Sequence, residues 1–295
     1  MDVSIIIVNY NTTELTIQTI KSIYEKTHDL LYEIILVDNA SSDITILDIN
    51  EVYPNVKLIR SSGNLGFGRA NNLGYKYAIG KYIFLLNPDT ILLNNAVKEL
   101  YDFLEAHIDV AIAGGQLCDA KCCMTHSFQL FFPSILGEIN SLFRQKISHL
   151  IDEMFVKIIS DKKYGYVAYV TGADMMIRRD DIEKFGFFDS DFFMYFEETE
   201  LCKRYSRFGR KIAFVLSSKI IHLEGKSFEF KENRSRLYIQ GRKTYYKKVH
   251  TAAYTQIANC IYRITCITGI WGSLLFFNRR KYQEWIQRYN LFLSI

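Results

Sequence analysis

The first third of the chain alternates short, continuously apolar segments with amphipathic ones. Residues 3–11 read as a continuous apolar run rich in β-branched side chains, and residues 32–43 are apolar again. Residues 12–27 between them carry apolar residues at helical spacing after a threonine cap. Apolar strands in a strand, helix, strand order are typical of a parallel sheet that helices cover on both faces. The sequence therefore predicts an α/β fold.

The same alternation continues to residue 117. Residues 55–62 and 81–90 read as further strands, residues 68–80 as a helix that ends at Gly80, residues 94–107 as another amphipathic helix, and residues 110–117 as another strand. Within residues 117–165, the segment 132–159 looks helical and amphipathic, without residues to which a chemical role can be assigned, and it could form a lid or lobe on the acceptor side. A compact protein with one large domain, or one domain and an appendage, fits a chain of 295 residues that is 49% hydrophobic with three prolines.

Three of the predicted strands end in polar residues. These are Asn9 and Asn11 after the first strand, Asp38 and Asn39 after the second, and Asn87 and Asp89 after the fourth. In open parallel sheets ligands bind outside the carboxyl ends of the strands, so we expect these side chains to converge on a ligand site. For Asp89 the sequence leaves a second interpretation open, in which it caps a following helix.

Charge and cysteine content narrow the classes of function. The net charge of +4 is too small to indicate a nucleic-acid partner, although residues 231–250 hold seven Lys or Arg against one acidic residue. Six cysteines without a CxxC pair are typical of reduced thiols, and adjacent Cys122 and Cys123 make a soft-metal site with Cys118 and His126 unfavourable. Residues 1–11 lack the features of a signal peptide, so we expect the protein to stay in the compartment where it is made.

A glycine-rich stretch, "SSGNLGFGRANNLG", follows the third strand. It lacks the GK[ST] of a P-loop and does not follow the first strand as a dinucleotide fingerprint does. We interpret its glycines as positions where the backbone approaches a ligand or a neighbouring strand, with Arg69 available to meet a phosphate.

Seven segments in order carry a resemblance to a known family: "SIIIVNYN", "ILVDNASSD", "NLGFGRANNLG", "FLLNPDT", "VTGADMMIRRD", "FFMYFEETELCKR" and "IHLEGKS". Together they closely resemble the inverting family 2 glycosyltransferases with a GT-A fold, and more narrowly the rhamnosyltransferase-like branch that builds bacterial surface polysaccharides. The resemblance covers residues 3–250. It implies a Rossmann-like, mostly parallel sheet in a GT-A domain of residues 1–230, followed by a basic, aromatic helical extension of residues 231–295.

The resemblance also implies a donor site for a nucleoside diphosphate sugar. Asp38 would accept a hydrogen bond from the imide N–H of uracil or thymine, and the backbone at Asn9 and Tyr10 would form the base pocket. Read alone, Asp38 and its neighbours could instead form a strand-end turn. The donor side is completed by Asn39, Gly66, Arg69, Asn72, Asn87 and Asp89.

A divalent metal is part of the same resemblance. Asn87 to Asp89 match the DxD position of the family with Asn in place of the first Asp, so Asp89 would hold Mg²⁺ or Mn²⁺ against the donor phosphates. His222 matches a family histidine near the metal, and an imidazole ligand favours Mn²⁺. A lone histidine after a strand is otherwise more often structural.

The adjacent Glu197 and Glu198 match the acidic pair of the family, in which the second residue is the catalytic base. Inversion requires a base that removes the proton of the acceptor hydroxyl, and neighbouring carboxylates raise each other's pKa. Here Glu198 stands where Asp is customary, and its extra methylene displaces the base. The alternative is that residues 197–204 form an exposed helical turn.

Residues 171–180 would supply the acceptor side. Gly172 and Ala173 are small enough for a sugar to approach, whereas Asp174 either binds the acceptor or bonds locally.

The apolar residues 264–277 are too few to span a membrane. With the basic segment before them they indicate an element that lies on an anionic bilayer, while a core helix or a dimer interface remains open. Because the acceptor implied by the family is lipid-linked, we expect a cytoplasmic protein at the inner face of the inner membrane. The sequence does not define the oligomeric state.

The leading hypothesis is a metal-dependent, inverting transfer of a sugar from a dTDP- or UDP-sugar, with dTDP-rhamnose as a candidate, to a hydroxyl of a lipid-linked glycan. The second is a catalytically weak nucleotide-sugar-binding homologue that acts as a scaffold, suggested by Asn87 and Glu198. A nucleotidyltransferase is disfavoured, because no glycine-rich loop follows the first strand.

Overall fold

The computed structural model describes residues 1–142, 146–223 and 231–295 of the protein. The strands are β1 (Val3–Asn9), β2 (Tyr32–Asp38), β3 (Val56–Arg60), β4 (Tyr82–Leu86), β5 (Thr90–Leu92), β6 (Val110–Cys118), β7 (Phe128–Gln129), β8 (Tyr164–Val167), β9 (Tyr169–Val170), β10 (Asp174–Arg178) and β11 (Lys211–His222). The helices are α1 (Thr13–Lys26), the 3-10 helix η1 (Ile44–Asp48), α2 (Ile49–Val52), α3 (Phe67–Tyr75), α4 (Ala96–Ala106), α5 (Ile135–Leu142), α6 (Lys146–Ile159), α7 (Arg179–Phe185), α8 (Glu197–Arg207), α9 (Lys231–Val249), α10 (Ala252–Leu275) and α11 (Arg279–Ser294).

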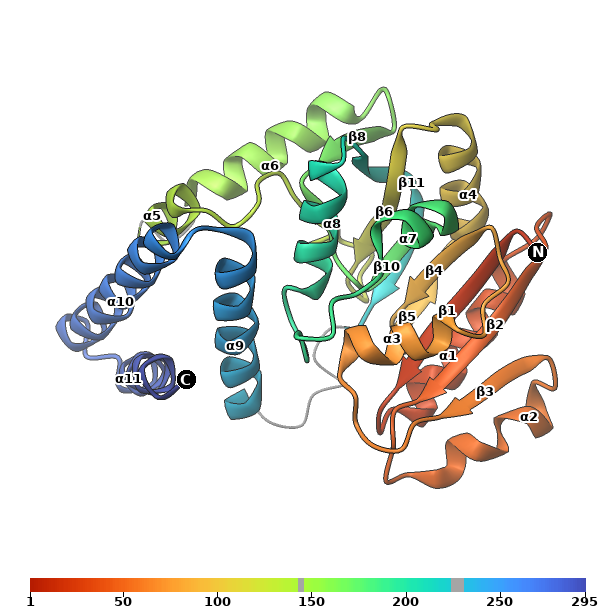
Figure 1. Ribbon diagram of the computed structural model, residues 1–295, viewed down its shortest axis with the longest axis horizontal. Coiled ribbons are helices and arrows are strands. Elements are labelled where there is room, and N and C mark those ends of the chain that lie inside the picture. Colours follow the sequence, from red (N-terminus) through yellow and green to blue (C-terminus); the bar gives the residue numbers. More distant parts are fainter. Residues whose placement is uncertain (143–145, 224–230) are drawn as a thin grey trace.

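The central sheet has the order β3-β2-β1-β4-β10-β6-β11-β5, with β8 beside β11 (Figure 1). The first four strands are parallel, as the alternating pattern predicts. In the second half β10 runs antiparallel to both β4 and β6, and β11 runs antiparallel to β5. The predicted α/β fold is confirmed, and the structure adds this mixed half.

Helices cover both faces of the sheet because the strands are apolar on both faces. Along β1, Ile5 and Ile7 pack into one core with Ile20 of α1 and Leu100 of α4. The alternate residue Ile6 packs into the other core, to which α3, α7 and α8 contribute. Successive side chains of a strand point to opposite faces, so a strand between two helical layers must be apolar throughout.

The helix that was predicted to end at Gly80 ends at Tyr75. Gly80 has a different role, because a Cβ atom there would lie 2.3 Å from the backbone nitrogen of Ser4. The Ser4 hydroxyl also accepts a hydrogen bond from the Gly80 N–H at 2.7 Å. Gly80 therefore allows the chain to pass directly over the start of β1 before β4 begins.

The C-terminal helices form a separate layer at one end of the sheet domain (Figure 1). Helix α9 contacts α8, and α10 packs against α11 and against α5 from the middle of the chain. Buried Arg242 joins these helices, since its guanidinium pairs with Glu138 of α5 and donates to the backbone oxygen of Ala258 in α10. The domain division at residue 230 stays a prediction, and α5 packs with the C-terminal side of it.

Residues 135–159 are helical, as predicted, and form α5 and α6 apart from residues 143–145, which lie outside the described residues. Across the described parts of the chain, no helix is long and apolar enough to cross a membrane.

Candidate active site at the carboxyl ends of the strands

The polar ends of the first strands lie at one edge of the sheet. In the register of β1 and β2, Asn9 is opposite Asp38. Strand β4 pairs with the other side of β1, so that Asn87 to Asp89 follow at the same edge. The parallel order thus places these segments together, as the sequence indicates.

Asn9 is fully buried, and its side chain is the hub of this edge. Its amide nitrogen donates to Asp38 Oδ1 at 3.3 Å and to Ser41 Oγ at 3.0 Å. Its amide oxygen accepts from Thr12 Oγ1 and Thr16 Oγ1 at 3.0 and 2.9 Å. The Asn9 side chain is therefore committed to joining β1, α1 and the loop after β2, which leaves the local backbone and the exposed Tyr10 to face a ligand.

Asp38 is 1% exposed and is held by one of its two carboxylate oxygens. Its Oδ1 accepts from Asn9 and from the Ser41 N–H at 3.3 Å. Within the part of the chain that the structure describes, Oδ2 makes no hydrogen bond, and Arg60 Nε lies 3.4 Å from it. A buried acceptor oxygen without a hydrogen bond is costly, and an N–H donor from a ligand would remove that cost.

Asn39 fixes the glycine-rich loop. Its amide donates to Asn64 Oδ1 and to the Gly66 backbone oxygen, and its oxygen accepts from the Leu65 N–H at 2.9 Å. Gly66 has φ of 79°, and a Cβ there would lie 2.0 Å from the Phe193 oxygen, so only glycine fits. The loop and the segment before α8 are consequently in direct contact.

Arg69 and Asn72 of α3 also contact the segment before α8. Arg69 Nε donates to the Ser190 backbone oxygen at 2.7 Å. The Asn72 amide exchanges two hydrogen bonds with the backbone of Phe188, at 2.8 and 3.2 Å. Both residues therefore position residues 188–190, whereas a contact with a donor phosphate stays a prediction.

Asp89 and His222 meet because β5 and β11 pair antiparallel, with His222 opposite Thr90. Asp89 is 2% exposed and precedes strand β5, so the interpretation that it caps a helix is wrong. Its Oδ1 lies 3.3 Å from His222 Nε2, and the Asn87 amide nitrogen lies 3.4 Å from the same imidazole nitrogen.

The chemistry of this pair fits a divalent cation. Adjacent ligands of an octahedral ion with bonds of about 2.1 Å are separated by roughly 3 Å, close to the observed spacing. A carboxylate oxygen and an imidazole nitrogen are both ligands that Mn²⁺ accepts. Among the residues that the structure describes, no group of three His, Cys, Asp or Glu side chains suited to a metal is present. Phosphate oxygens and water would complete the coordination of the Asp89 and His222 pair.

Glu197 and Glu198 begin α8, directly after two residues in the left-handed conformation. Tyr195 and Phe196 have φ of 70° and 69°, which is unusual for large side chains. Gly241 of α9 makes room for this turn, because a Cβ there would lie 2.4 Å from the Tyr195 backbone oxygen. The start of α8 is thus held by packing against α9.

The acidic pair is buried, so the alternative of an exposed helical turn is wrong. Glu197 is 3% exposed, and Glu198 is partly buried. Burial raises the pKa of Glu197 well above its ordinary range, with the carboxylate of Glu198 as the second cause. Burial raises the pKa of Glu198 to about 7, and backbone N–H groups at the helix start oppose the rise. The third acid, Glu200, pairs instead with Arg204 at 2.9 Å.

The residues predicted for the acceptor side divide into two groups. Gly172 lies against the ring of Phe67, since a Cβ there would be 3.0 Å from it, and the Ala173 oxygen accepts from the Asn87 N–H at 2.9 Å. Asp174 is fully buried, and its Oδ2 accepts from the Gly115 N–H at 2.6 Å. Burial raises the pKa of the Asp174 carboxyl well above its ordinary range. The structure therefore gives Asp174 the local bond that the sequence left open.

These contacts form a ring around the strand ends, which α1 closes because Thr16 Oγ1 donates to Asn9, the partner of Asp38, and Thr19 Oγ1 donates to the Pro88 oxygen. Asn39 contacts Gly66, and the N–H of Phe67 donates to the Phe193 oxygen at 3.0 Å, four residues before Glu197. On the other side, a Cβ at Gly68 would lie 3.7 Å from Glu197 Cβ, and Phe67 contacts Gly172. Asn87 then leads from Ala173 to Asp89 and His222. The ring joins the positions predicted for nucleobase recognition, for metal binding and for the catalytic base.

Sequence reasoning missed several residues of this ring. Arg60 beside Asp38, and Tyr195, Phe196 and Gly241 behind the acidic pair, were not singled out. Ser41 lies in the quoted motif "VDNASSD", which was a usable signal. No local pattern indicates a contact between α9 and residue 195.

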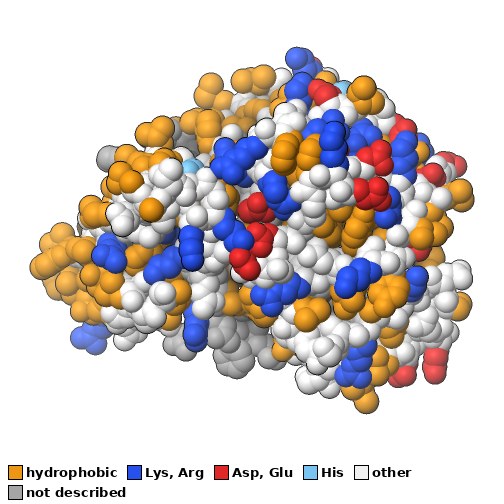
Figure 2. Space-filling model, in the orientation of Figure 1, with side chains coloured by type: hydrophobic (Ala, Val, Ile, Leu, Met, Phe, Trp, Pro, Cys, Tyr) orange, Lys and Arg blue, Asp and Glu red, His pale blue; other side chains and the backbone are white. Residues whose placement is uncertain are grey.

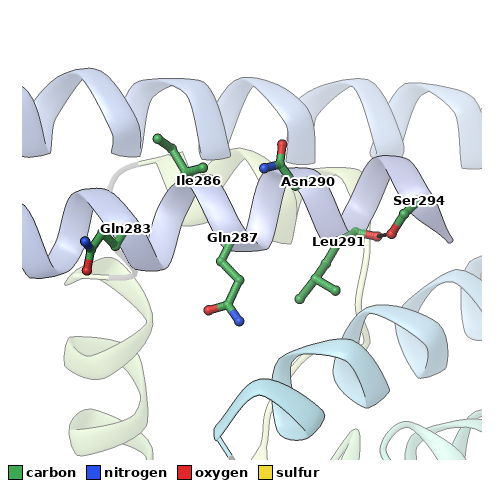
Figure 3. Close-up of a pocket in the computed structure, with 6 residues that line it drawn as sticks. All are labelled: Gln283, Ile286, Gln287, Asn290, Leu291 and Ser294. Carbon is green, nitrogen blue, oxygen red and sulfur yellow. Dashed lines mark hydrogen bonds between the residues drawn. The ribbon is translucent and has the colours of Figure 1, made fainter.

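A groove of about 490 Å³ lies elsewhere, along α11 on the C-terminal helices (Figure 3). Its lining contains no charged residue: Gln283, Ile286, Gln287, Asn290, Leu291 and Ser294. A diphosphate needs cationic or metal partners, so this groove does not match the donor.

Solved structures with the same fold are glycosyltransferases. The chain aligns over 83% of its length with 50% of GalNAc-T7, solved with UDP, GalNAc and Mn²⁺, at a TM-score of 0.58 and 17% identity. It aligns over 98% of its length with 84% of the mannosyltransferase PcManGT from Pyrobaculum calidifontis, solved in complex with GDP-Man and Mn²⁺. The TM-score is 0.57 and the sequence identity is 14%. These likenesses define the GT-A glycosyltransferase fold.

The sequence comparison defines the family. Residues 4–186 match the glycosyl transferase family 2, and the chain belongs to this family. It is 26% identical over 218 residues to the low-salt glycan biosynthesis hexosyltransferase Agl10 of Haloferax volcanii, which covers 70% of this chain and 62% of that protein. It is 28% identical over 204 residues to the rhamnosyltransferase WbbL of Escherichia coli. That alignment covers 65% of this chain and 72% of WbbL. The resemblance to family 2 and its rhamnosyltransferase-like branch is confirmed, and residues 4–186 form a glycosyl transferase family 2 domain.

Proposed function

We propose that the protein is an inverting, metal-dependent glycosyltransferase that moves a sugar from a dTDP- or UDP-sugar to a hydroxyl of a lipid-linked glycan in surface polysaccharide synthesis. The observation that carries the proposal is the ring of contacts that joins Asp38, the pair of Asp89 and His222, and the pair of Glu197 and Glu198 at one edge of the sheet. The names of the relatives, which include rhamnosyltransferases and a hexosyltransferase, favour a hexose such as rhamnose as the transferred sugar.

Base recognition rests on Asp38. Its Oδ2, which has no hydrogen bond from the described residues, would accept the imide N–H of uracil or thymine. Guanine also offers an N–H donor, but the shape of the Asn9 and Tyr10 backbone would decide whether a purine enters. Asn39 and the loop at Gly66 hold the backbone that would flank the ribose and phosphates.

Asp89 and His222 would hold the divalent cation. When bound, this cation neutralises the charge that develops on the leaving diphosphate. Asp89 supplies a fixed carboxylate, since its burial and its position before β5 leave it little freedom to move. Because His222 lies opposite Thr90 in the sheet, the two ligands keep their spacing without a flexible loop.

Glu198 would act as the general base. With a pKa near 7 it is partly ionised at neutral pH and basic enough to accept the proton of the acceptor hydroxyl. The oxygen then attacks the anomeric carbon from the face opposite the diphosphate, so the configuration inverts without a covalent enzyme intermediate. Burial raises the pKa of the neighbouring Glu197 well above its ordinary range, which favours its protonated form.

The proposal is tested by incubating the protein with dTDP-rhamnose, UDP-glucose and UDP-galactose, Mn²⁺ and a lipid-linked acceptor. Release of the nucleoside diphosphate with formation of a glycosidic bond of inverted configuration, read by NMR, is expected for one donor. A product of retained configuration would contradict the mechanism. Donor binding without turnover of any donor would favour the scaffold hypothesis instead.

The proposed place of the protein is the cytoplasmic surface of the inner membrane, where a lipid-linked acceptor would be found. This place follows from the proposed acceptor.

A further inference from the structure

Helix α10 is apolar on two sides. One side packs against α5, α9 and α11 through residues such as Tyr262 and Cys266, which are 8% and 0% exposed. The other side carries a second row of large apolar residues that the described chain leaves exposed: Ile257, Ile264, Ile267, Trp271 and Leu274. Their spacing of three, four and seven residues places them along one stripe of the helix. A helix that only closed a core would not need this stripe.

The stripe continues onto two neighbouring helices. Helix α6 exposes Leu150, Met154 and Ile158, which are four residues apart and share one face. Helix α5, which packs against α10 and contacts α6, exposes Leu136 and Ile139. In Figure 1 the three helices follow one another along one edge of the molecule, and in Figure 2 hydrophobic side chains gather along that edge. Exposed apolar residues that continue over three helices are typical of an interaction surface.

The end of α10 adds aromatic residues and positive charge. Phe276 and Phe277, directly after the helix, are 78% and 93% exposed, and Trp271 is 64% exposed. Arg279, Arg280 and Lys281 follow at once and are exposed. Aromatic residues next to basic ones are typical of the boundary between lipid headgroups and acyl chains.

The charge around this surface selects its partner. Arg263 of α10 and Arg279, Arg280 and Lys281 after it are exposed beside the apolar residues, whereas Arg242 is buried against Glu138 and does not contribute. Exposed cations beside an apolar surface complement the headgroups of anionic lipids. We propose that the apolar edge formed by α5, α6, α10 and residues 276–277 docks onto the surface of an anionic bilayer, with α10 parallel to the membrane plane. This inference goes beyond the proposed transfer reaction and does not depend on it.

The orientation follows from the two sides of α10. Since one side is fixed to the protein through Tyr262 and Cys266, only the opposite side can enter the lipid, and the helix must lie along the surface. Phe276 and Phe277 at its end would insert deepest, with Arg279 to Lys281 beside the phosphates. This orientation assigns a role to residues 135–159, to which the sequence alone gave none.

The test is cosedimentation of the full chain with vesicles of phosphatidylcholine, with and without phosphatidylglycerol. We expect binding to the vesicles that contain phosphatidylglycerol, weakened by salt. The double variant Phe276→Ser, Phe277→Ser should bind at least about tenfold more weakly, because it removes two exposed aromatic rings and no core contact. The control is Ile79→Ser, Ile108→Ser, which alters two largely exposed apolar residues of the sheet domain and should bind like the original protein.

Three results would overturn the proposal. The first is no binding of the original protein to either vesicle. The second is equal binding of the Phe276 and Phe277 variant and the control. The third is a dimer in solution that this variant converts to a monomer while vesicle binding is absent, which would identify the edge as a contact between two copies. Circular dichroism and thermal unfolding, measured on the same samples, show that each variant is folded and keep this test independent of the proposed reaction.

Discussion

Asp38 at the end of β2 and Glu198 at the start of α8 are both carboxylates of the candidate site, yet they are held in different ways. Asp38 belongs to a network of hydrogen bonds with Asn9 and Ser41 that joins three elements. Glu198 has Thr199 Oγ1 at 3.5 Å and follows two left-handed residues that α9 holds in place. The donor side is therefore fixed by hydrogen bonds, and the catalytic side by packing and by its backbone conformation.

The difference has a chemical consequence. Burial with few partners favours the protonated form of Glu198 and raises its pKa to about 7. The catalytic side should therefore be sensitive to pH near neutrality. Changes on one side should leave the other largely unaffected, and the following predictions test this separation.

The largest effect is expected for Glu198→Gln. Loss of a general base lowers turnover by about 10²–10⁴-fold, and we expect about 10³-fold in kcat. The affinity for the nucleotide should stay within about twofold, since the donor side is intact. Turnover by rapid-quench assay and binding by calorimetry check this. Glu183→Gln, an exposed acid on α7, is the control and should behave like the original protein.

Asp89→Asn should weaken Mn²⁺-dependent nucleotide binding on the order of 10²-fold. Loss of residues that merely support a metal ligand costs 10–100-fold in affinity, and a ligand itself should cost at least as much. Titrations in Mn²⁺ and in EDTA separate the metal-dependent part of the nucleotide affinity from the metal-independent part. The variant and the original protein should bind the nucleotide alike in EDTA. Equal affinities in Mn²⁺ would remove Asp89 from the metal site.

Asp38→Asn should weaken recognition of the nucleobase and leave the rate of sugar transfer unchanged. A hydrogen bond to a charged group contributes about 2 kcal/mol, so the affinity for a uracil or thymine nucleotide should fall roughly 30-fold. Turnover at saturating donor should be retained. The control is Asp48→Asn on η1, an exposed acid near the same loop. An unchanged ratio of affinities for dTDP, UDP and GDP would contradict the assignment of Asp38.

The pH dependence sharpens the comparison further. A base must be deprotonated to act, so kcat/KM should fall about tenfold per pH unit below about pH 7 and level off above it. The free energy of unfolding should change in the opposite direction. Because burial raises the pKa of Glu198 from its ordinary value to about 7, ionisation of Glu198 destabilises the folded state as the pH rises between these two values. Glu198→Gln should remove the acid limb of the profile, and nucleotide affinity should not follow it.

The smallest effect is expected for Gly241→Ala. In an ordinary helix this change stabilises, but here the new methyl would contact the Tyr195 oxygen, so we expect a loss of about 1–3 kcal/mol in the free energy of unfolding. Displacement of Glu198 should lower kcat several-fold with nucleotide binding intact. Gln240→Ala, the neighbouring position, controls for the helix itself. A stabilised and fully active Gly241→Ala would show that α9 does not support the catalytic side.

The sequence predicts the parallel half of the sheet well, because each strand from β1 to β4 is a local apolar run with a polar end. It also places Asp38, Asp89 and the acidic pair through motifs. Only the family resemblance puts His222 near Asp89, since their contact depends on antiparallel pairing of β5 with β11 across more than 120 residues, which no local pattern shows. Gly80 was misread because a glycine after a helical pattern looks like a helix end, while its close approach to Ser4 is a tertiary contact.

The same limit applies to the C-terminal helices. Residues 264–277 are apolar throughout, so no periodicity separates the side that packs on the protein from the side that faces outward. Cys266 is fully buried and Trp271 is largely exposed, although both lie in one apolar run. Only the packing of α5, α9 and α11 decides which residues remain available for a partner.

The most direct test of the central claim is a calorimetric titration of the purified protein with UDP, dTDP and GDP, each with and without Mn²⁺. The proposed site predicts Mn²⁺-dependent binding of a uracil or thymine nucleotide, lost in Asp89→Ala and kept in Glu198→Gln. Binding of no nucleotide, or binding of equal strength with and without the metal, would contradict the proposed donor site.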